Sequence, residues 1–94
     1  MDAAYYEELA GRLYCLLIGL DDRIGNEQAQ MLHHFTEAGE YGLALEEIAG
    51  TLAQDTIAIT RQERGDMLAL AAQMKLEGDL VPRTLAACPE MGGR

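Results

Sequence analysis

The chain has little positive charge and no serine. Seven Lys and Arg face sixteen Asp and Glu, which gives a formal net charge of -9. Nucleic acids and anionic membranes are both bound through clustered Lys and Arg, so this balance argues against either partner. The lack of serine excludes a serine nucleophile. No G-x-G-x-x-G or G-K-[ST] motif is present either, so nucleotide binding has no motif to support it.

Long apolar runs and cysteine pairs are missing too. The apolar runs cover only a few residues, whereas a membrane-spanning helix needs about 20. The N-terminal sequence is acidic, unlike a secretory signal, so we expect no export. Cys15 and Cys88 lie far apart and outside any C-x-x-C pair, which indicates two reduced thiols in a cytoplasmic protein. Because Cys15 falls in an apolar helical segment, we expect it to be buried.

Helical periodicity dominates what is present. The chain has 94 residues, of which 49% are hydrophobic, so residues 1–94 form one helical domain, with a tail over 89–94 that we expect to be frayed. Apolar residues at spacings of three and four predict four helices. The first starts after an N-cap at Asp2, the second runs from an N-cap at Asn26 to Gly39, the third covers about Glu40–Gln54, and the fourth follows Thr60.

Two further segments complete the predicted fold. The alternation over Thr56–Ile59 predicts a short extended connector, because no second strand is available to pair with it. Thr60 and Glu63 have the spacing of a capping box. Pro82 suits the first position of a C-terminal helical turn, with Val81 extended before it. We therefore predict an all-α fold, a small four-helix bundle with a short extended connector and a C-terminal helical turn.

The apolar positions also predict which side chains face the core. The predicted inward residues are Tyr6, Leu9, Leu13, Leu16, Leu17 and Leu20, widened by Tyr5, Tyr14 and Ile18; Gln28, Met31, Leu32, Phe35 and Ala38; Tyr41, Ala44, Leu45, Ile48, Ala49 and Leu52; and Met67, Leu68, Leu70, Ala71 and Met74. Gly42 and Gly50 interrupt the third helix, and glycine there often marks close packing against a neighbour.

A catalytic or metal site has weak support. His33 and Glu37 are spaced to share one helix face, but a metal needs three or four ligands and no third is apparent. His34 points about 100° away from His33. A solvent-facing pair on one helix is the simpler interpretation. Because the carboxylates fall mostly on polar helix faces, we expect no catalytic residue, no metal and no cofactor.

The negative charge is concentrated between Asp21 and Asp55. Eight acids in that stretch face a single base, Arg23, so it carries seven of the nine net negative charges. If the second and third helices form an antiparallel hairpin around Gly39, their polar faces join into one acidic patch. Such a patch steers a basic partner and raises association rates by roughly 10- to 1,000-fold at low salt. An acidic surface that serves solubility alone is the alternative.

Three segments follow in a distinctive order. Residues 37–49 read EAGEYGLALEEIA, residues 57–63 read IAITRQE, and residues 67–74 read MLALAAQM. The pattern Glu-x-Gly-Glu-x-x-x-Ala-Leu-Glu, then Ile-x-Ile-Thr-x-x-Glu, spans roughly residues 30–76, about half the chain. In this pattern the chain resembles the MafI-type immunity proteins, small bacterial proteins linked to polymorphic secreted toxins. Each piece also has a plain helical explanation: a turn glycine, an apolar face and a capping box.

The resemblance implies an intracellular antidote that binds a cognate toxin and blocks its active site. Many such toxins are nucleases and therefore basic, and carboxylates would mimic the phosphates in their grooves. We predict a non-catalytic immunity protein whose partner-binding residues are Glu37, Glu40, Glu46 and Glu47, with Asp21, Asp22 and Tyr41 secondary. For the acids the alternative role is solubility or support of the turn, and for Tyr41 it is core packing.

Two other functions stay open at this point. The first is an interaction or adaptor module that uses an apolar surface and includes the case of a homodimer. The second is a minimal enzyme or metal protein built on His33 and Glu37. The sequence leaves the oligomeric state open.

Overall fold

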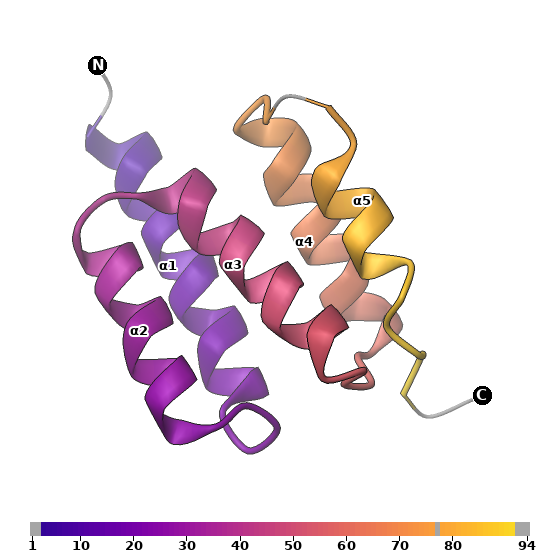
Figure 1. Ribbon diagram of the computed structural model, residues 1–94. Coiled ribbons are helices and arrows are strands. Elements are labelled where there is room, and N and C mark those ends of the chain that lie inside the picture. Colours follow the sequence, from indigo (N-terminus) through magenta and orange to yellow (C-terminus); the bar gives the residue numbers. More distant parts are fainter. Residues whose placement is uncertain (1–2, 77, 92–94) are drawn as a thin grey trace.

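The structure is a small bundle of helices. The computed structural model describes residues 3–76 and 78–91, and five helices follow one another there: α1 (Ala3–Leu20), α2 (Asn26–Glu37), α3 (Tyr41–Gln54), α4 (Arg61–Gln73) and α5 (Leu80–Leu85) (Figure 1). The prediction of an all-α four-helix bundle with a C-terminal helical turn, here α5, is confirmed. None of these helices combines the length and apolarity needed to cross a bilayer.

α3 is the central element. It packs against each of the other four helices, with α1 and α2 on one side and α4 and α5 on the other (Figure 1). The predicted face of α3 is confirmed, since its inward side chains, Ala44, Leu45, Ile48, Ala49 and Leu52, are fully buried. α2 and α3 run antiparallel and meet at the turn around Gly39, so the predicted hairpin is present.

On the other helices, fewer side chains are buried than the pattern of apolar residues predicted. α1 buries its five leucines, but Cys15 and Ile18 are exposed, and the prediction for both was wrong. At 100° per residue, these two positions fall on the side of α1 opposite to the buried leucines. Tyr6 lies on the leucine side but near the start of the helix, and 37% of its surface is exposed.

α2 and α4 show the same effect. α2 buries Ala29, Leu32 and Thr36, whereas the predicted inward residues Met31 and Ala38 point away from this stripe and are exposed. Thr36 satisfies its hydroxyl by donating to the Leu32 carbonyl at 3.0 Å. α4 buries Met67, Leu70 and Ala71 as predicted, but Leu68, about 100° from Met67, is exposed.

Gly39 forms the turn that sets the direction of α3. Its φ is +81°, its amide donates to the Thr36 carbonyl at 3.1 Å, and the Glu40 amide donates to the Phe35 carbonyl at 3.0 Å. These two bonds make a Schellman motif, as the predicted C′ glycine required. The start of α2 differs from prediction, because Gly25, not Asn26, is its N-cap. Glu40 is the N-cap of α3, which agrees with the predicted start at about Glu40. Asp2 lies outside the described residues.

The connector and the end of the chain pair with each other. Ile59 is fully buried and forms a parallel bridge with Glu90. Its amide donates to the Pro89 carbonyl at 2.9 Å, and the Met91 amide donates to the Ile59 carbonyl at 2.6 Å. The connector therefore pairs with another segment, which we did not expect. Residues 89–91, which we predicted to be frayed, form backbone hydrogen bonds to it. Residues 92–94 lie outside the described part.

The C-terminal helix also starts two residues earlier than predicted. α5 begins at Leu80, so Val81 is helical and buried rather than extended, and Pro82 is the third helical residue rather than the first. The first turn of a helix tolerates proline because its N–H groups have no intrahelical partner.

Candidate functional site

The predicted binding residues are spread along the α2–α3 hairpin. Asp21 and Asp22 lie in the turn before α2, Glu37 ends α2, Glu40 and Tyr41 begin α3, and Glu46 and Glu47 lie in the middle of α3. α2 has 12 residues and is therefore about 18 Å long. The fold therefore gathers Glu37, Glu40 and Tyr41 around Gly39 but leaves Asp21 and Asp22 at the far end of α2.

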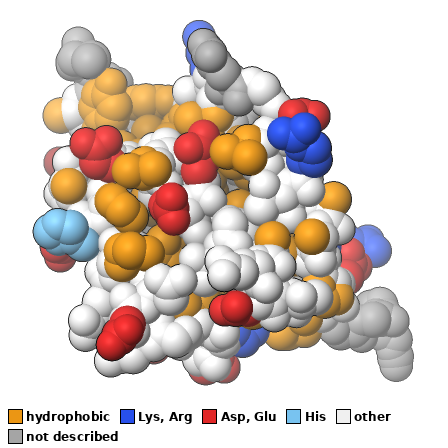
Figure 2. Space-filling view, viewed as in Figure 1, with side chains coloured by type: hydrophobic (Ala, Val, Ile, Leu, Met, Phe, Trp, Pro, Cys, Tyr) orange, Lys and Arg blue, Asp and Glu red, His pale blue; other side chains and the backbone are white. Residues whose placement is uncertain are grey.

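The four main acids are not neutralised. Glu37 and Glu40 are exposed, and Glu46 and Glu47 are half-buried. None of them forms an ion pair with any residue that the structure describes. Figure 2 shows acidic side chains interspersed with hydrophobic ones over α2 and α3. The acidic area is therefore a mixed surface, not one continuous patch.

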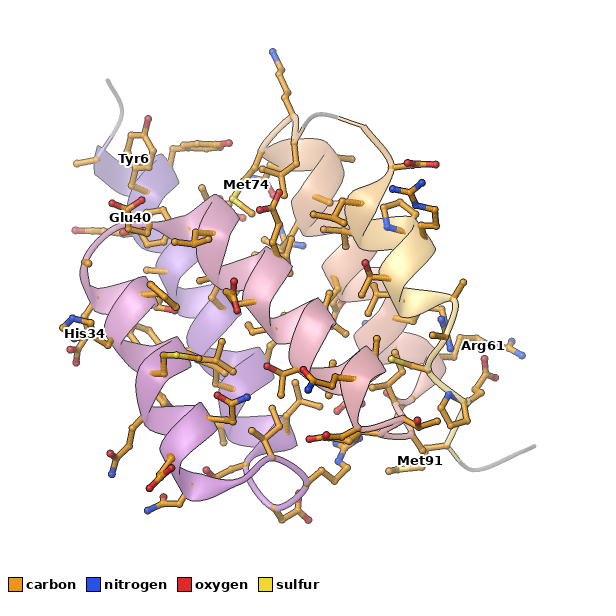
Figure 3. The ribbon with its side chains drawn as sticks, viewed as in Figure 1. Tyr6, His34, Glu40, Arg61, Met74 and Met91 are labelled. Atoms are coloured by element: carbon orange, nitrogen blue, oxygen red, sulfur yellow. The ribbon has the colours of Figure 1, made fainter. Side chains whose placement is uncertain are left out.

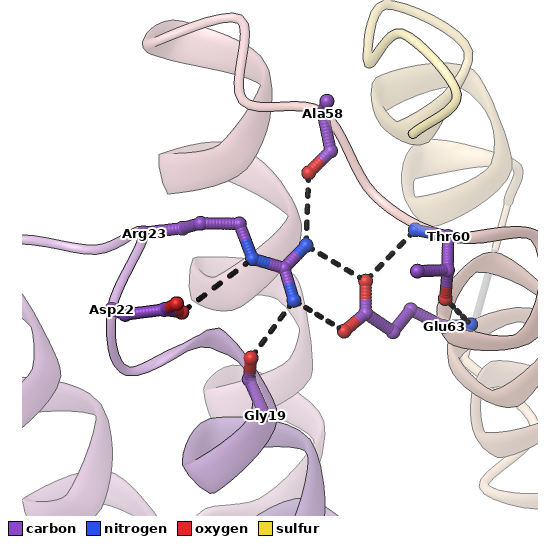
Figure 4. Close-up of polar contacts among 6 residues, drawn as sticks. All are labelled: Gly19, Asp22, Arg23, Ala58, Thr60 and Glu63. Carbon is purple, nitrogen blue, oxygen red and sulfur yellow. Dashed lines mark hydrogen bonds and ion pairs between the residues drawn. The ribbon is translucent and has the colours of Figure 1, made fainter. Parts of the chain in front are cut away.

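Arg23, the one base in the acidic stretch, points into the fold. Its Nη1 donates to Glu63 Oε1 and to the Ala58 carbonyl, both at 3.0 Å. Its Nη2 donates to Glu63 Oε2 at 2.7 Å and to the Gly19 carbonyl at 2.8 Å (Figure 4). Asp22 is only a distant ion-pair partner, at 3.8 Å from Nε. The cation therefore compensates an acid of α4 rather than the acids of α2 and α3.

Glu63 is held from two sides. The predicted capping box is confirmed: the Glu63 amide donates to the Thr60 hydroxyl, and Glu63 Oε1 accepts from the Thr60 amide, each at 2.9 Å. Burial raises the pKa of Glu63, but hydrogen bonds from Arg23 and Thr60 and the charge of Arg23 outweigh burial, so this pKa lies below its usual value. Arg23 shows the matching effect, because its hydrogen bond to Glu63 raises its pKa.

Two other arginines also serve the fold. Arg12 of α1 donates to the Gln73 side chain. Arg64 of α4 donates to the carbonyls of Leu85 and Cys88 at 2.6 and 2.7 Å, at the end of α5. These contacts leave the acids of α2 and α3 without a compensating cation among the described residues.

A groove and a pocket form where α1 meets other parts of the fold. A groove of about 420 Å³ separates α1 from α4, with Leu16 and Leu70 among its lining residues and Glu8, Cys15 and Asp66 along it. A second pocket, of about 280 Å³, lies near the Gly39 turn and is lined by Tyr5, Tyr6 and Tyr41 together with Met74 and Leu76, which follow α4. Sequence reasoning did not find either one.

The histidines do not assemble a metal site. No group of three or more His, Cys, Asp or Glu side chains that could hold a metal is present in the parts described, residues 3–76 and 78–91. The ring of His33 stacks on Tyr14, with centroids 5.6 Å apart. Burial raises the pKa of Tyr14, and the negative charge of Glu37 adds to the effect.

Comparisons with protein-family models, curated proteins and solved structures give no match to this chain. The resemblance to the MafI-type immunity proteins therefore stays a prediction that rests on the sequence pattern alone.

Proposed function

We propose that the chain is a non-catalytic immunity protein that acts in the cytoplasm and neutralises a cognate secreted bacterial toxin, a basic nuclease-like domain. The observation that supports this proposal is the charge of Glu37, Glu40, Glu46 and Glu47, which no cation among the described residues compensates and which lies within the first segment that carries the resemblance, residues 37–49. Arg23, the only base of that stretch, is committed to Glu63.

The proposed mechanism has an electrostatic and an apolar part. Unpaired carboxylates attract the Lys and Arg side chains with which a nuclease binds phosphates, and this attraction speeds the encounter. Exposed Met31 and Leu43, on α2 and α3, add apolar surface to the acids. An interface with apolar residues at its centre and charges at its rim has the usual composition of a stable protein complex.

The direct experiment first identifies a large secreted protein encoded beside this gene, which the proposal predicts, and then uses its C-terminal domain. We expect the purified chain to bind that domain and to inhibit its activity, with an affinity that falls as salt is raised because salt screens surface charges. A domain that is toxic but is neither bound nor inhibited would refute the proposal.

An interaction module with an apolar surface is the second candidate. Leu68 and Leu80 are exposed, at 36% and 46%, and both line a groove of about 160 Å³ at α4 and α5 whose lining also includes Pro82 and, from α3, Glu46. A dimer formed through this groove would persist at high salt, since apolar contacts are not screened. Sedimentation at several concentrations in low and high salt distinguishes such a dimer from a monomer whose partner is basic.

A further inference from the structure

The tyrosine-lined pocket forms where three parts of the chain meet. Tyr5 and Tyr6 come from the start of α1, Tyr41 from the start of α3, and Met74 and Leu76 from the end of α4 and the loop after it. α1 and α3 both start at the end of the bundle that carries the Gly39 turn (Figure 1). The pocket therefore adjoins the part of the acidic surface around Glu40.

The three rings have a defined arrangement. Tyr6 stacks on Tyr41 with centroids 6.2 Å apart and planes 26° from parallel. Tyr5 meets Tyr6 edge-on, at 5.2 Å and 74°. The Tyr5 hydroxyl donates to the Gln73 carbonyl at 3.2 Å, which fixes this ring against α4. The faces of aromatic rings carry partial negative charge and attract cations.

A carboxylate lies beside these rings. Glu40 falls in the chain between Gly39 and Tyr41, which both line the pocket, and its side chain is exposed. Figure 3 shows Glu40 and Tyr6 at the same end of the molecule, with Met74 on the α4 side. Glu40 forms no ion pair within the described parts of the chain. Ring faces, a thioether and an uncompensated carboxylate together make a surface complementary to a cation on an apolar stem.

We propose that this pocket receives one arginine or lysine side chain of the basic protein partner, an inference that rests on the proposed function and specifies its anchor. The cation lies against the tyrosine rings near Glu40, while the aliphatic stem packs on Met74 and Leu76. At about 280 Å³ the pocket falls just under the range of roughly 300–1,000 Å³ typical of small-molecule sites. Its size thus suits a single side chain better than a cofactor.

The test uses a probe that does not depend on the toxin. N-acetyl-arginine amide is titrated into the full-length chain while NMR follows the ring signals of Tyr6 and Tyr41, and N-acetyl-citrulline amide serves as the neutral isostere. We expect saturable shifts at these two rings with arginine and none with citrulline. Equal shifts with both probes, or shifts spread over all acidic residues, would overturn the proposal.

Variants then locate the contact. Tyr6→Leu and Glu40→Gln should each weaken probe binding by about two- to fivefold, the range of an exposed cation–π or ion-pair contact. Glu27→Gln, an exposed acid at the other end of α2, is the matched control and should leave it unchanged. Circular dichroism confirms that each variant is folded. An unchanged probe affinity in folded Tyr6→Leu contradicts the assignment.

The two proposals can fail separately. If the neighbouring toxin domain binds but the arginine probe does not, the pocket proposal fails and the immunity function stands. If the probe binds in the pocket but the toxin domain does not bind the chain, the immunity function fails. If both bind, Tyr6→Leu should also weaken the toxin complex, and an unchanged toxin affinity would remove the pocket from the interface.

Discussion

The guanidinium of Arg23 and the carboxylate of Glu63 are joined by two hydrogen bonds, of 3.0 and 2.7 Å, across 40 positions of the chain. Their side chains are only 19% and 15% exposed. The pair connects the turn after α1 to the start of α4, two helices that are separated along part of their length by a groove. It therefore closes one end of the bundle with a charged contact rather than an apolar one.

Replacing Glu63 should destabilise the fold. Glu63→Gln removes the charge that Arg23 faces in a poorly solvated position, and we expect the free energy of unfolding to fall by about 2 kcal/mol in urea titrations. Glu90→Gln is the control, because the Arg61–Glu90 pair is exposed and 3.6 Å long. That change should cost less than about 1 kcal/mol. An equal loss of unfolding free energy in the two variants would show that the Arg23–Glu63 pair stabilises the fold no more than the exposed Arg61–Glu90 pair.

The same pair should produce a pH dependence of stability. The pKa of Glu63 is lower in the folded chain than its ordinary value, so folding favours the ionised form. The contribution of ionised Glu63 to the free energy of unfolding is therefore complete above that ordinary pKa. This contribution is lost as the pH falls through the pKa of Glu63 in the folded chain. Subtracting the unfolding free energies of Glu63→Gln from those of the wild type at each pH isolates this contribution. A difference that stays constant from neutral pH to below 4 would contradict it.

Two glycines of α3 should respond to alanine in opposite ways. A Cβ at Gly50 would meet nothing within 4 Å, so our prediction of close packing there was wrong, and Gly50→Ala should raise stability by about 1 kcal/mol through helix propensity. A Cβ at Gly42 would lie 3.0 Å from Leu76 Cδ2, which confirms a close approach at that position. Gly42→Ala should therefore gain less or lose stability. Thermal unfolding of both variants tests this; a similar gain in both would contradict it.

The two thiols should differ in reactivity. Cys15 is exposed on α1, whereas Cys88 is buried after α5, and burial raises the pKa of its thiol although the nearby Arg64 opposes that effect. Since the thiolate is the reactive form, a thiol reagent should label Cys15 quickly and Cys88 slowly in the folded chain. Cys15→Ala should abolish the fast phase. Two equally fast thiols before denaturation would show that Cys88 is not protected.

Local pattern predicted the central helix better than its neighbours. The periodicity of α3 identified its buried face because α3 contacts all four other helices. The apolar side chains on that face are therefore packed against neighbouring helices. α2 buries Leu32 as predicted, but its other two buried positions are the small side chains Ala29 and Thr36. Ranking by apolarity selects Met31 in their place. Residue type alone does not show which face a half-covered helix turns inward.

The sequence pattern did not predict contacts between residues that are far apart in the chain. The capping box identified the local role of Glu63, but nothing local indicates that Arg23 would be its partner. The tyrosine pocket combines residues of α1, of α3 and of the segment that follows α4, so no single segment contains its signal. One clue was available: alternate helices of an up-and-down bundle start at the same end, which places Tyr6 and Tyr41 together.

We propose that the acids on and between α2 and α3 bind a basic toxin, and reversing the charge of one of them is the sharpest test of this binding. The measurement is the affinity of the neighbouring toxin domain for folded Glu47→Lys, compared with Glu8→Lys, which makes the same charge change in the α1–α4 groove. We expect Glu47→Lys to weaken binding by about tenfold or more and Glu8→Lys to have little effect. An unchanged affinity for Glu47→Lys, or an equal loss in both variants, would contradict the account.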